Sequence, residues 1–314
     1  MLSSRMQSGS WTLAFNDRQI LSHSPEHPFL TAIRREKTYE TDRGTVKETV
    51  TEVERVPLTD VFETGDTVVL SAKAHSVSVT LTERADGARL AFSGEPGWAY
   101  EFRLPAAEGE AVFGGGEQYR QTNLRGETVV NFVSEHIKAK TVIEKALLPR
   151  CLYREKPHSA IGSYAPMPVF VTDRGRMIRF DTASDGKSHF GDDAYTFVFD
   201  ACPKSLTLLI GDSFDALLSA YAKRVINRQY LPDWCFDGMI LGIQGGTQTI
   251  LEKTFAMLDA GAKVCGVWSQ DWSGENRTVM GKQVWWNWEV DENLYPDLKG
   301  AIQKLNARGV RFLA

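Results

Sequence analysis

Polar side chains directly follow two apolar stretches in the C-terminal third of the chain. Gln244 comes after one of them, and Gln270 and Asp271 come after the other, Val264-Cys265-Gly266-Val267-Trp268. Amides and carboxylates bind the hydroxyl groups of polar ligands, and a few of them in an otherwise apolar setting are typical of a ligand pocket. These three residues are therefore the first candidates for a binding site.

The loop that follows combines aromatic rings with amides and cations. Five of the eight tryptophans of the chain lie from Trp268 to Trp288. The same stretch holds four further candidates for substrate contact: Arg277, Lys282, Gln283 and Trp286. Ring faces pack against the apolar side of a pyranose while amides bind its hydroxyls, so this composition indicates a sugar pocket. Tryptophan-rich loops also fill barrel ends and subunit interfaces, and composition alone leaves that alternative open.

Strands and helices alternate from residue 236 onward. The expected elements are a strand at 238–243, a helix at about 248–260, a strand at 264–268, a helix that ends before Gly309 and a strand at 310–313. The two apolar strands are continuous enough to be buried. This β-α-β-α-β order predicts parallel strands with helical crossovers, and functional groups then gather at the carboxyl ends of the strands.

Residues 1 to about 205 predict an antiparallel β-sandwich. The stretch 76–81 alternates polar and apolar side chains, and turn signals such as Ala85-Asp86-Gly87 separate several runs of this kind. A helix with its apolar face spaced from Phe214 to Val225 follows. We therefore expect a sandwich domain with a linker helix over 1–230 and an α/β domain over 231–314.

Composition excludes several classes of protein. The 314 residues carry a formal net charge of −4, which argues against general nucleic-acid binding. The four cysteines form neither a CxxC motif nor a cluster with histidine, so we expect neither structural zinc nor a disulfide framework. No other metal and no cofactor are expected. Signal-peptide and membrane-spanning patterns are not seen, so a cytoplasmic protein without a membrane span is expected. A homo-oligomer is left open.

Three motifs, in order along the chain, resemble those of glycoside hydrolase family 31, whose members are retaining α-glycosidases. The segment 112–118 is similar to the F/Y-G-x-G-E pattern of their N-terminal sandwich, 168–175 to a P-F-x-x-S-x-x-G strand, and 265–272 to a barrel strand that ends W-x-D-x-D. The resemblance covers nearly the whole chain. It implies a multidomain β plus α/β fold, in which an N-terminal antiparallel β-sandwich precedes the first strands and helices of a (β/α)8 TIM barrel.

Within the family, the chain is similar to the sulfoquinovosidase branch. Ordinary α-glucosidases place an aspartate where this chain has Gln270, and a neutral amide suits an anionic substrate. In sulfoquinovosidases two amides, an arginine and a tryptophan bind the sulfonate, and by position Gln244, Gln270 and Trp286 match the amides and the tryptophan. The resemblance implies release of sulfoquinovose from α-sulfoquinovosides such as sulfoquinovosyl glycerol or diacylglycerol.

The arginine of that set has no counterpart. Gln283 stands three residues before Trp286, where the branch has arginine. A charge-assisted hydrogen bond is about twice as strong as a neutral one, so the difference bears on the substrate. Either Arg277 or Lys282 supplies the cation from a neighbouring position, or the subsite prefers a neutral or differently charged sugar.

Catalysis by a retaining glycosidase needs two carboxyl groups about 5–5.5 Å apart. In the family both are aspartates on later barrel strands and loops, so the resemblance places the nucleophile and the acid/base beyond Ala314. Asp271 is expected to orient the substrate, no residue of this segment is expected to be catalytic, and the segment alone should be inactive. Two other interpretations remain: a non-catalytic carbohydrate-binding fragment, and a structural remnant that buries its tryptophans against a partner.

Overall fold

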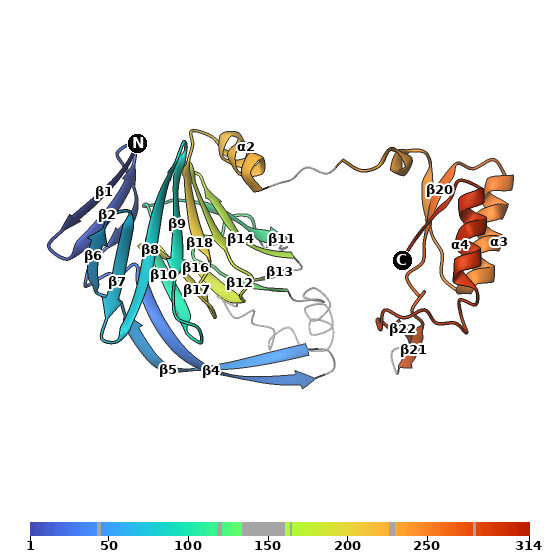
Figure 1. Ribbon diagram of the computed structural model, residues 1–314, viewed down its shortest axis with the longest axis horizontal. Coiled ribbons are helices and arrows are strands. Elements are labelled where there is room, and N and C mark those ends of the chain that lie inside the picture. Colours follow the sequence, from blue (N-terminus) through green and yellow to red (C-terminus); the bar gives the residue numbers. More distant parts are fainter. Residues whose placement is uncertain (43–44, 118–120, 134–160, 164, 226–229, 279–280) are drawn as a thin grey trace, which may run out of the picture. The chain divides into compact units, whose positions relative to one another are not determined.

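The computed structural model describes residues 1–42, 45–117, 121–133, 161–163, 165–225, 230–278 and 281–314 (Figure 1). It divides into two units, Met1–Ile226 and Asn227–Ala314, called unit 1 and unit 2 below. The division lies close to the boundary expected after Tyr230.

Unit 1 consists almost entirely of β-strands, as predicted for residues 1 to about 205. A small sheet contains β1 (Leu2–Gln7), β2 (Ser10–Phe15) and β3 (Arg18–His23). A seven-stranded sheet has the order β13 (Ile161–Ser163), β12 (Thr128–Val133), β16 (Gly186–Phe190), β17 (Ala194–Phe199), β10 (Ala99–Pro105), β4 (Leu30–Asp42) and β5 (Thr45–Pro57). An eight-stranded sheet has the order β11 (Val112–Glu117), β14 (Ala165–Thr172), β15 (Arg176–Asp181), β18 (Ser205–Ile210), β9 (Gly87–Ser93), β8 (His75–Arg84), β7 (Thr67–Ala72) and β6 (Asp60–Thr64). The helix α2 (Phe214–Val225) follows the last strand.

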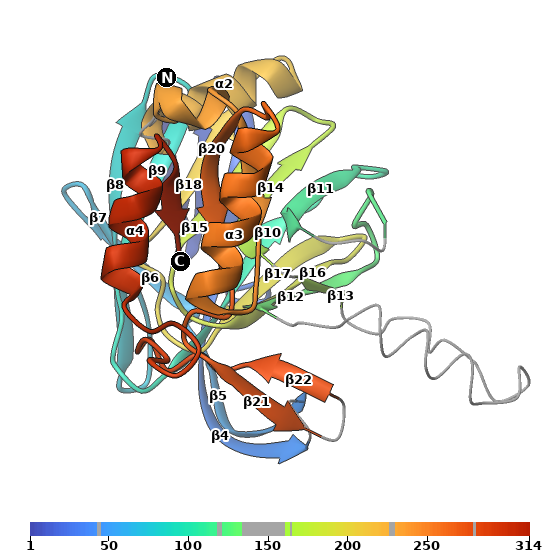
Figure 2. The same cartoon turned by 90° about the vertical axis from the view of Figure 1, so that its right-hand side faces the viewer.

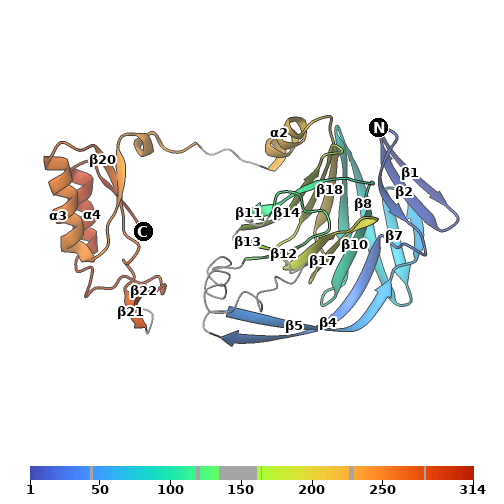
Figure 3. The same ribbon diagram turned by 180° about the vertical axis from the view of Figure 1, so that it is seen from behind.

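Aromatic rings from the two larger sheets meet between them. The ring of Phe102 on β10 lies 5.2 Å from that of Phe180 on β15, and the ring of Phe190 on β16 lies 4.8 Å from that of Phe170 on β14. All four side chains are buried, because alternate residues of each strand point to the same face of its sheet. The two sheets therefore pack face to face around one apolar core (Figure 3).

A buried ion pair also joins the two larger sheets. The guanidinium of Arg176 on β15 and the hydroxyl of Tyr195 on β17 both donate to Oε2 of Glu110, each over 2.8 Å. Burial alone would raise the pKa of Glu110, but the charge of Arg176 and the hydrogen bonds outweigh it and hold that pKa below its ordinary value. Because each partner is desolvated, removal of one should be strongly destabilising.

Unit 2 contains the predicted β-α-β-α-β order. Its elements are a 3₁₀ turn η1 (Asp233–Phe236), β19 (Met239–Gly242), α3 (Gly246–Asp259), β20 (Val264–Trp268), β21 (Glu275–Thr278), β22 (Gly281–Val284), α4 (Leu298–Ala307) and β23 (Arg311–Leu313). Strands β19, β20 and β23 form a parallel sheet in that order, while β21 and β22 form an antiparallel hairpin. Figure 2 shows α3 and α4 side by side along the sheet. Closure of such strands into a (β/α)8 barrel stays a prediction, because the part of the chain described here holds three of them.

The two faces of the parallel sheet differ in burial. Leu241 and Val267 lie in register and pack with the helices in one apolar cluster. On β19, Met239 is 46% exposed and Ile240 is 44% exposed. The prediction that 238–243 is buried was therefore wrong for these two side chains, because among the described residues no full layer covers this part of the strand.

Candidate functional site

Gln244 and Gln270 meet at the carboxyl ends of β19 and β20. Nε2 of Gln244 donates to Oε1 of Gln270 over 3.1 Å. Gly242 pairs with Trp268 in the parallel ladder, so each glutamine stands two residues past the paired strand ends. Gln244 is exposed and Gln270 is half-buried, which leaves the amide oxygen of the first and the amide nitrogen of the second for a ligand. This amide pair is neutral and can bind an acceptor and a donor at once.

Asp271 is fully buried beside the amide pair. Its Oδ2 accepts from the backbone N–H of Gly245 over 2.8 Å, and its Oδ1 accepts from the hydroxyls of Ser269, over 3.1 Å, and Tyr295. The carboxylate thus ties the end of β20 to the turn that carries Gln244. That Asp271 orients a substrate stays a prediction; in the structure its carboxylate has no exposed surface and binds the turn that carries Gln244.

The same carboxylate lies at the start of a helix. Gly245 is the N-cap of α3 with φ +106°, and Gly246 follows with φ +92°. A Cβ at Gly246 would lie 2.3 Å from the backbone oxygen of Leu294, so a side chain does not fit there. The partial positive charge of the α3 N-terminus favours the carboxylate of Asp271 at this place.

Tyr295 is the member of this network that the sequence did not indicate. Its hydroxyl is fully buried and lies 2.7 Å from Oγ of Ser269. Burial, together with the hydrogen bond to Asp271, raises the pKa of Tyr295 to about 12. The residue follows Asp271 only after the β21–β22 hairpin, and no periodic pattern links the two positions.

The tryptophan-rich loop that follows β20 and extends to Trp288 is hydrogen-bonded to residues just after the end of that strand. The N–H of Gly274 donates to the backbone oxygen of Asp271 over 3.0 Å, the N–H of Trp285 donates to the oxygen of Gly274 over 2.9 Å, and Oγ of Ser273 donates to the oxygen of Trp285 over 2.7 Å. These bonds place Trp286 one residue beyond an anchored position.

The indole rings of Trp285, Trp286 and Trp288 in this loop are each more than half exposed. Trp286 is 52% exposed and Trp288 is 74% exposed, and their ring centroids lie 6.0 Å apart with an interplanar angle of 37°. Exposed indole rings so close together offer a surface on which a sugar ring could stack. Their exposure leaves the alternative of a partner interface equally open.

The hairpin separates the residues proposed to bind an anion. Lys282 and Gln283 are consecutive on β22 and therefore point to opposite faces. Nζ of Lys282 lies 2.7 Å from Oε2 of Glu275, with which it forms an ion pair. Arg277 is the register partner of Lys282, but its side chain lies outside the described residues. Lys282 thus does not stand on the face of Gln283, where the resemblance expects a cation.

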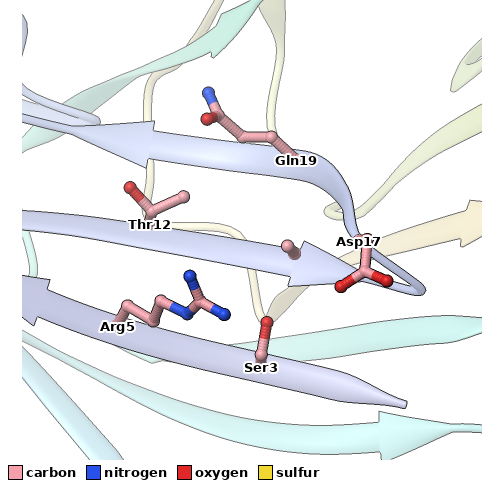
Figure 4. Close-up of a pocket in the computed structure, with 6 residues that line it drawn as sticks. Ser3, Arg5, Thr12, Asp17 and Gln19 are labelled. Atoms are coloured by element: carbon pink, nitrogen blue, oxygen red, sulfur yellow. The ribbon is translucent and has the colours of Figure 1, made fainter.

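A hollow lies on the small sheet of unit 1, away from the amide pair. Its volume is about 190 Å³, and Figure 4 shows Arg5, Thr12 and Gln19 on the three successive strands that line it. None of its lining residues is aromatic, so it lacks a stacking surface for a sugar.

Neither a candidate metal site nor a membrane-spanning helix is found among the described residues. No three histidine, cysteine, aspartate or glutamate side chains there are grouped so that they could hold a metal ion. No helix of the described ranges is long and apolar enough to cross a bilayer.

The chain is similar to curated glycosidases over nearly its whole length. It is 29% identical to the sulfoquinovosidase of Agrobacterium fabrum over 307 residues, 96% of this chain and 46% of that protein. It is also 29% identical to the sulfoquinovosidase of Escherichia coli K12 over 317 residues, 97% of this chain and 46% of that protein. The chain thus spans about half the length of these relatives. No protein-family model matches it.

A solved structure agrees with these relatives. A family 31 sulfoquinovosidase from E. rectale, in complex with an aza-sugar inhibitor, superimposes with a TM-score of 0.76 at 27% identity and covers 99% of this chain and 47% of its own. The resemblance inferred from the three motifs is thereby confirmed. The chain is a homologue of the sulfoquinovosidases, glycosidases of glycoside hydrolase family 31.

Proposed function

We propose that the protein containing this chain is a retaining α-glycosidase that releases sulfoquinovose from α-sulfoquinovosides such as sulfoquinovosyl glycerol or diacylglycerol. The observation that carries the proposal is the neutral amide pair of Gln244 and Gln270, which the buried Asp271 holds at the carboxyl ends of two parallel strands. Amides can donate to sulfonate oxygens without the repulsion that an exposed carboxylate would add. The similarity to sulfoquinovosidases supports the same substrate class.

Under this proposal, each of the four residues of the candidate site has a defined role. Gln244 and Gln270 bind the polar groups of the sugar, Trp286 offers a ring face, and Asp271 keeps the glutamines in place. The buried carboxylate of Asp271 is surrounded by donors, so it cannot approach an anomeric carbon. The nucleophile and the acid/base must therefore be other carboxyl groups of the protein.

A neutral or differently charged sugar is the second candidate substrate. It is favoured by the hairpin, in which Lys282 is paired with Glu275 and an uncharged Gln283 occupies the opposite face. An α-glucosidase of the same family would need no cation at this subsite.

The experiment compares hydrolysis of an aryl α-sulfoquinovoside and an aryl α-glucoside by the intact protein. The proposal expects the larger kcat/KM for the sulfonated substrate and a first product of retained α configuration by NMR. The variant Gln270→Asp should lower kcat/KM for the sulfonated substrate about 100-fold, because two like charges a few ångströms apart repel by several kcal/mol at an effective dielectric constant of 20. Gln303→Asp, which adds the same charge to the exposed surface of α4, is the matched control.

Faster turnover of the plain glucoside would overturn the sulfoquinovose assignment and leave the glycosidase class intact. Binding of both sugars without turnover would instead support a carbohydrate-binding role.

A further inference from the structure

A hollow of about 290 Å³ lies on the outer face of the eight-stranded sheet of unit 1, beside α2. Four arginines line it: Arg84 on β8, Arg89 on β9, Arg179 on β15 and Arg224 on α2. The chain as a whole is acidic, with a net charge of −4, so this gathering of cations runs against the overall balance.

The strand register places two of these arginines in one row. Arg89 pairs with Thr207 of β18, and Thr207 pairs in turn with Arg179. Strands are spaced by about 4.8 Å, so the two arginines start about 10 Å apart with a hydroxyl between them. Long side chains at that separation can close on one oxyanion from both sides, and the hydroxyl of Thr207 can donate to it from below.

Carboxylates neutralise only part of this cluster. Arg224 pairs with Asp86, and Arg179 lies 3.9 Å from Asp181, at the outer limit of an ion pair. Within the described residues, neither Arg84 nor Arg89 has an ion-pair or hydrogen-bond partner on its side chain. Like charges gathered on a sheet are unfavourable unless something of opposite charge lies between them.

The floor of the hollow is apolar. Met177 and Leu209 pair across β15 and β18 one row along from Arg179, and both are buried. The apolar surface that a ligand can reach comes from α2, where the half-buried Tyr221 and the exposed Val225 line the hollow. A ligand here would meet the arginine cations on the sheet and apolar side chains on α2, a combination typical of a small-molecule pocket.

We propose that this arginine-lined pocket binds a small amphiphilic anion, a sulfonate, sulfate or phosphate attached to a short apolar group. The oxyanion lies between Arg89 and Arg179, and the apolar group packs against Tyr221 and Val225 of α2. The site belongs to unit 1 and does not depend on the glycosidase assignment. Its ligand is either a free organic anion or the headgroup of an anionic amphiphile, which share this chemistry.

The test measures binding of hexanesulfonate to the intact protein by calorimetry at low ionic strength. The affinity for inorganic sulfate measures the contribution of the charge alone, and the affinity for hexanol measures the contribution of the apolar group alone. Hexanesulfonate should bind saturably and more tightly than either. Arg89→Gln and Arg179→Gln should each weaken it about 10-fold or more, because each removes charge-assisted hydrogen bonds.

The matched control is Arg5→Gln. Arg5 is exposed and lines the other hollow of unit 1, so its loss should leave hexanesulfonate binding unchanged. Circular dichroism verifies that each variant is folded. Flotation with phosphatidylglycerol vesicles, lost in Arg89→Gln, assigns the anion to a lipid headgroup, whereas binding without flotation assigns it to a free ligand.

Two results would overturn the proposal. One is no saturable binding of hexanesulfonate by the wild-type protein at millimolar concentration. The other is equal binding by the wild-type protein, Arg89→Gln and Arg179→Gln, which would place the anion elsewhere.

Discussion

The variant Asp271→Ala tests the inference that a buried carboxylate organises the candidate site. It removes the acceptor of three hydrogen bonds, from Gly245 N–H, Ser269 Oγ and the hydroxyl of Tyr295. Ser269 and Tyr295 can still bond to each other over 2.7 Å, but the N–H of Gly245 loses its side-chain acceptor. The largest local effect is therefore expected at Gly245, in the turn that carries Gln244.

The magnitude follows from the kind of bond lost. A hydrogen bond to a charged acceptor contributes about 1.5–3 kcal/mol, so the amide hydrogen of Gly245 should exchange about 10- to 100-fold faster with solvent. The free energy of unfolding should fall by about 3–5 kcal/mol, the usual effect of removing one partner from a buried charged group. KM for the sugar substrate should rise, because Gln244 is no longer held beside Gln270.

Hydrogen exchange with mass spectrometry, read on peptides that span Gly245, is the assay. The matched control is Asp259→Ala, which removes a carboxylate that is 66% exposed and paired with Arg308, and which should change stability by no more than about 1 kcal/mol. Asp271→Asn should fall between the two, because its amide can present an oxygen to Gly245 only if the hydroxyls of Ser269 and Tyr295 rotate to accept. Unchanged exchange at Gly245 in a folded Asp271→Ala protein would refute the reasoning.

Three further predictions concern other parts of the chain. Gln283→Arg should tighten binding of a sulfonated sugar about 10-fold, as measured by calorimetry. Lys282→Gln, on the other face of the hairpin, should change the affinity little. Equal effects of the two variants would show that Gln283 does not contact the sulfonate. Arg176→Ala should lower the free energy of unfolding, measured in urea, by about 3–5 kcal/mol, against about 0.5 kcal/mol for the exposed Arg5→Ala. A loss as small as that of the control would contradict a stabilising role for the buried pair of Arg176 and Glu110. The raised pKa of Tyr295 contributes stability that is complete below pH about 10 and is lost as the pH rises toward about 12. The difference in free energy of unfolding between wild type and Tyr295→Phe should therefore shrink over that range and stay constant near neutral pH.

Strong periodic patterns predicted the elements well. The alternation at 76–81 became part of β8, and the apolar spacing after Asp212 became α2. The β21–β22 hairpin was not predicted, because Glu275–Thr278 carries polar side chains on both faces and so shows no period of two. The small β1–β3 sheet was likewise not distinguished from the rest of the predicted sandwich.

The candidate site was predictable in part, for a geometric reason. Parallel strands bring their carboxyl ends together, so Gln244 and Gln270 were expected to meet, and their side chains do. Residue spacing could not show that Asp271 would be buried, because burial depends on Ser269 and Tyr295 closing around it. It also could not show that Lys282 and Gln283 lie on opposite faces, because the strand β22 that separates them was not predicted.

The arrangement of charge around the amide pair explains how a negative residue is compatible with the proposed sulfonated substrate. The carboxylate of Asp271 lies in the interior, where three donors and the N-terminus of α3 offset its charge, and only neutral amides reach the surface. An aspartate at position 270 would instead place a second negative charge in the space that a sulfonate needs. On the proposed function, the described part of the site would accept an anion without adding an unpaired cation of its own, since Gln283 is uncharged and Lys282 is paired with Glu275. For this reason Gln270→Asp and Gln283→Arg are complementary experiments. The first tests whether an added negative charge weakens the binding of a sulfonated sugar, and the second tests whether an added positive charge strengthens it.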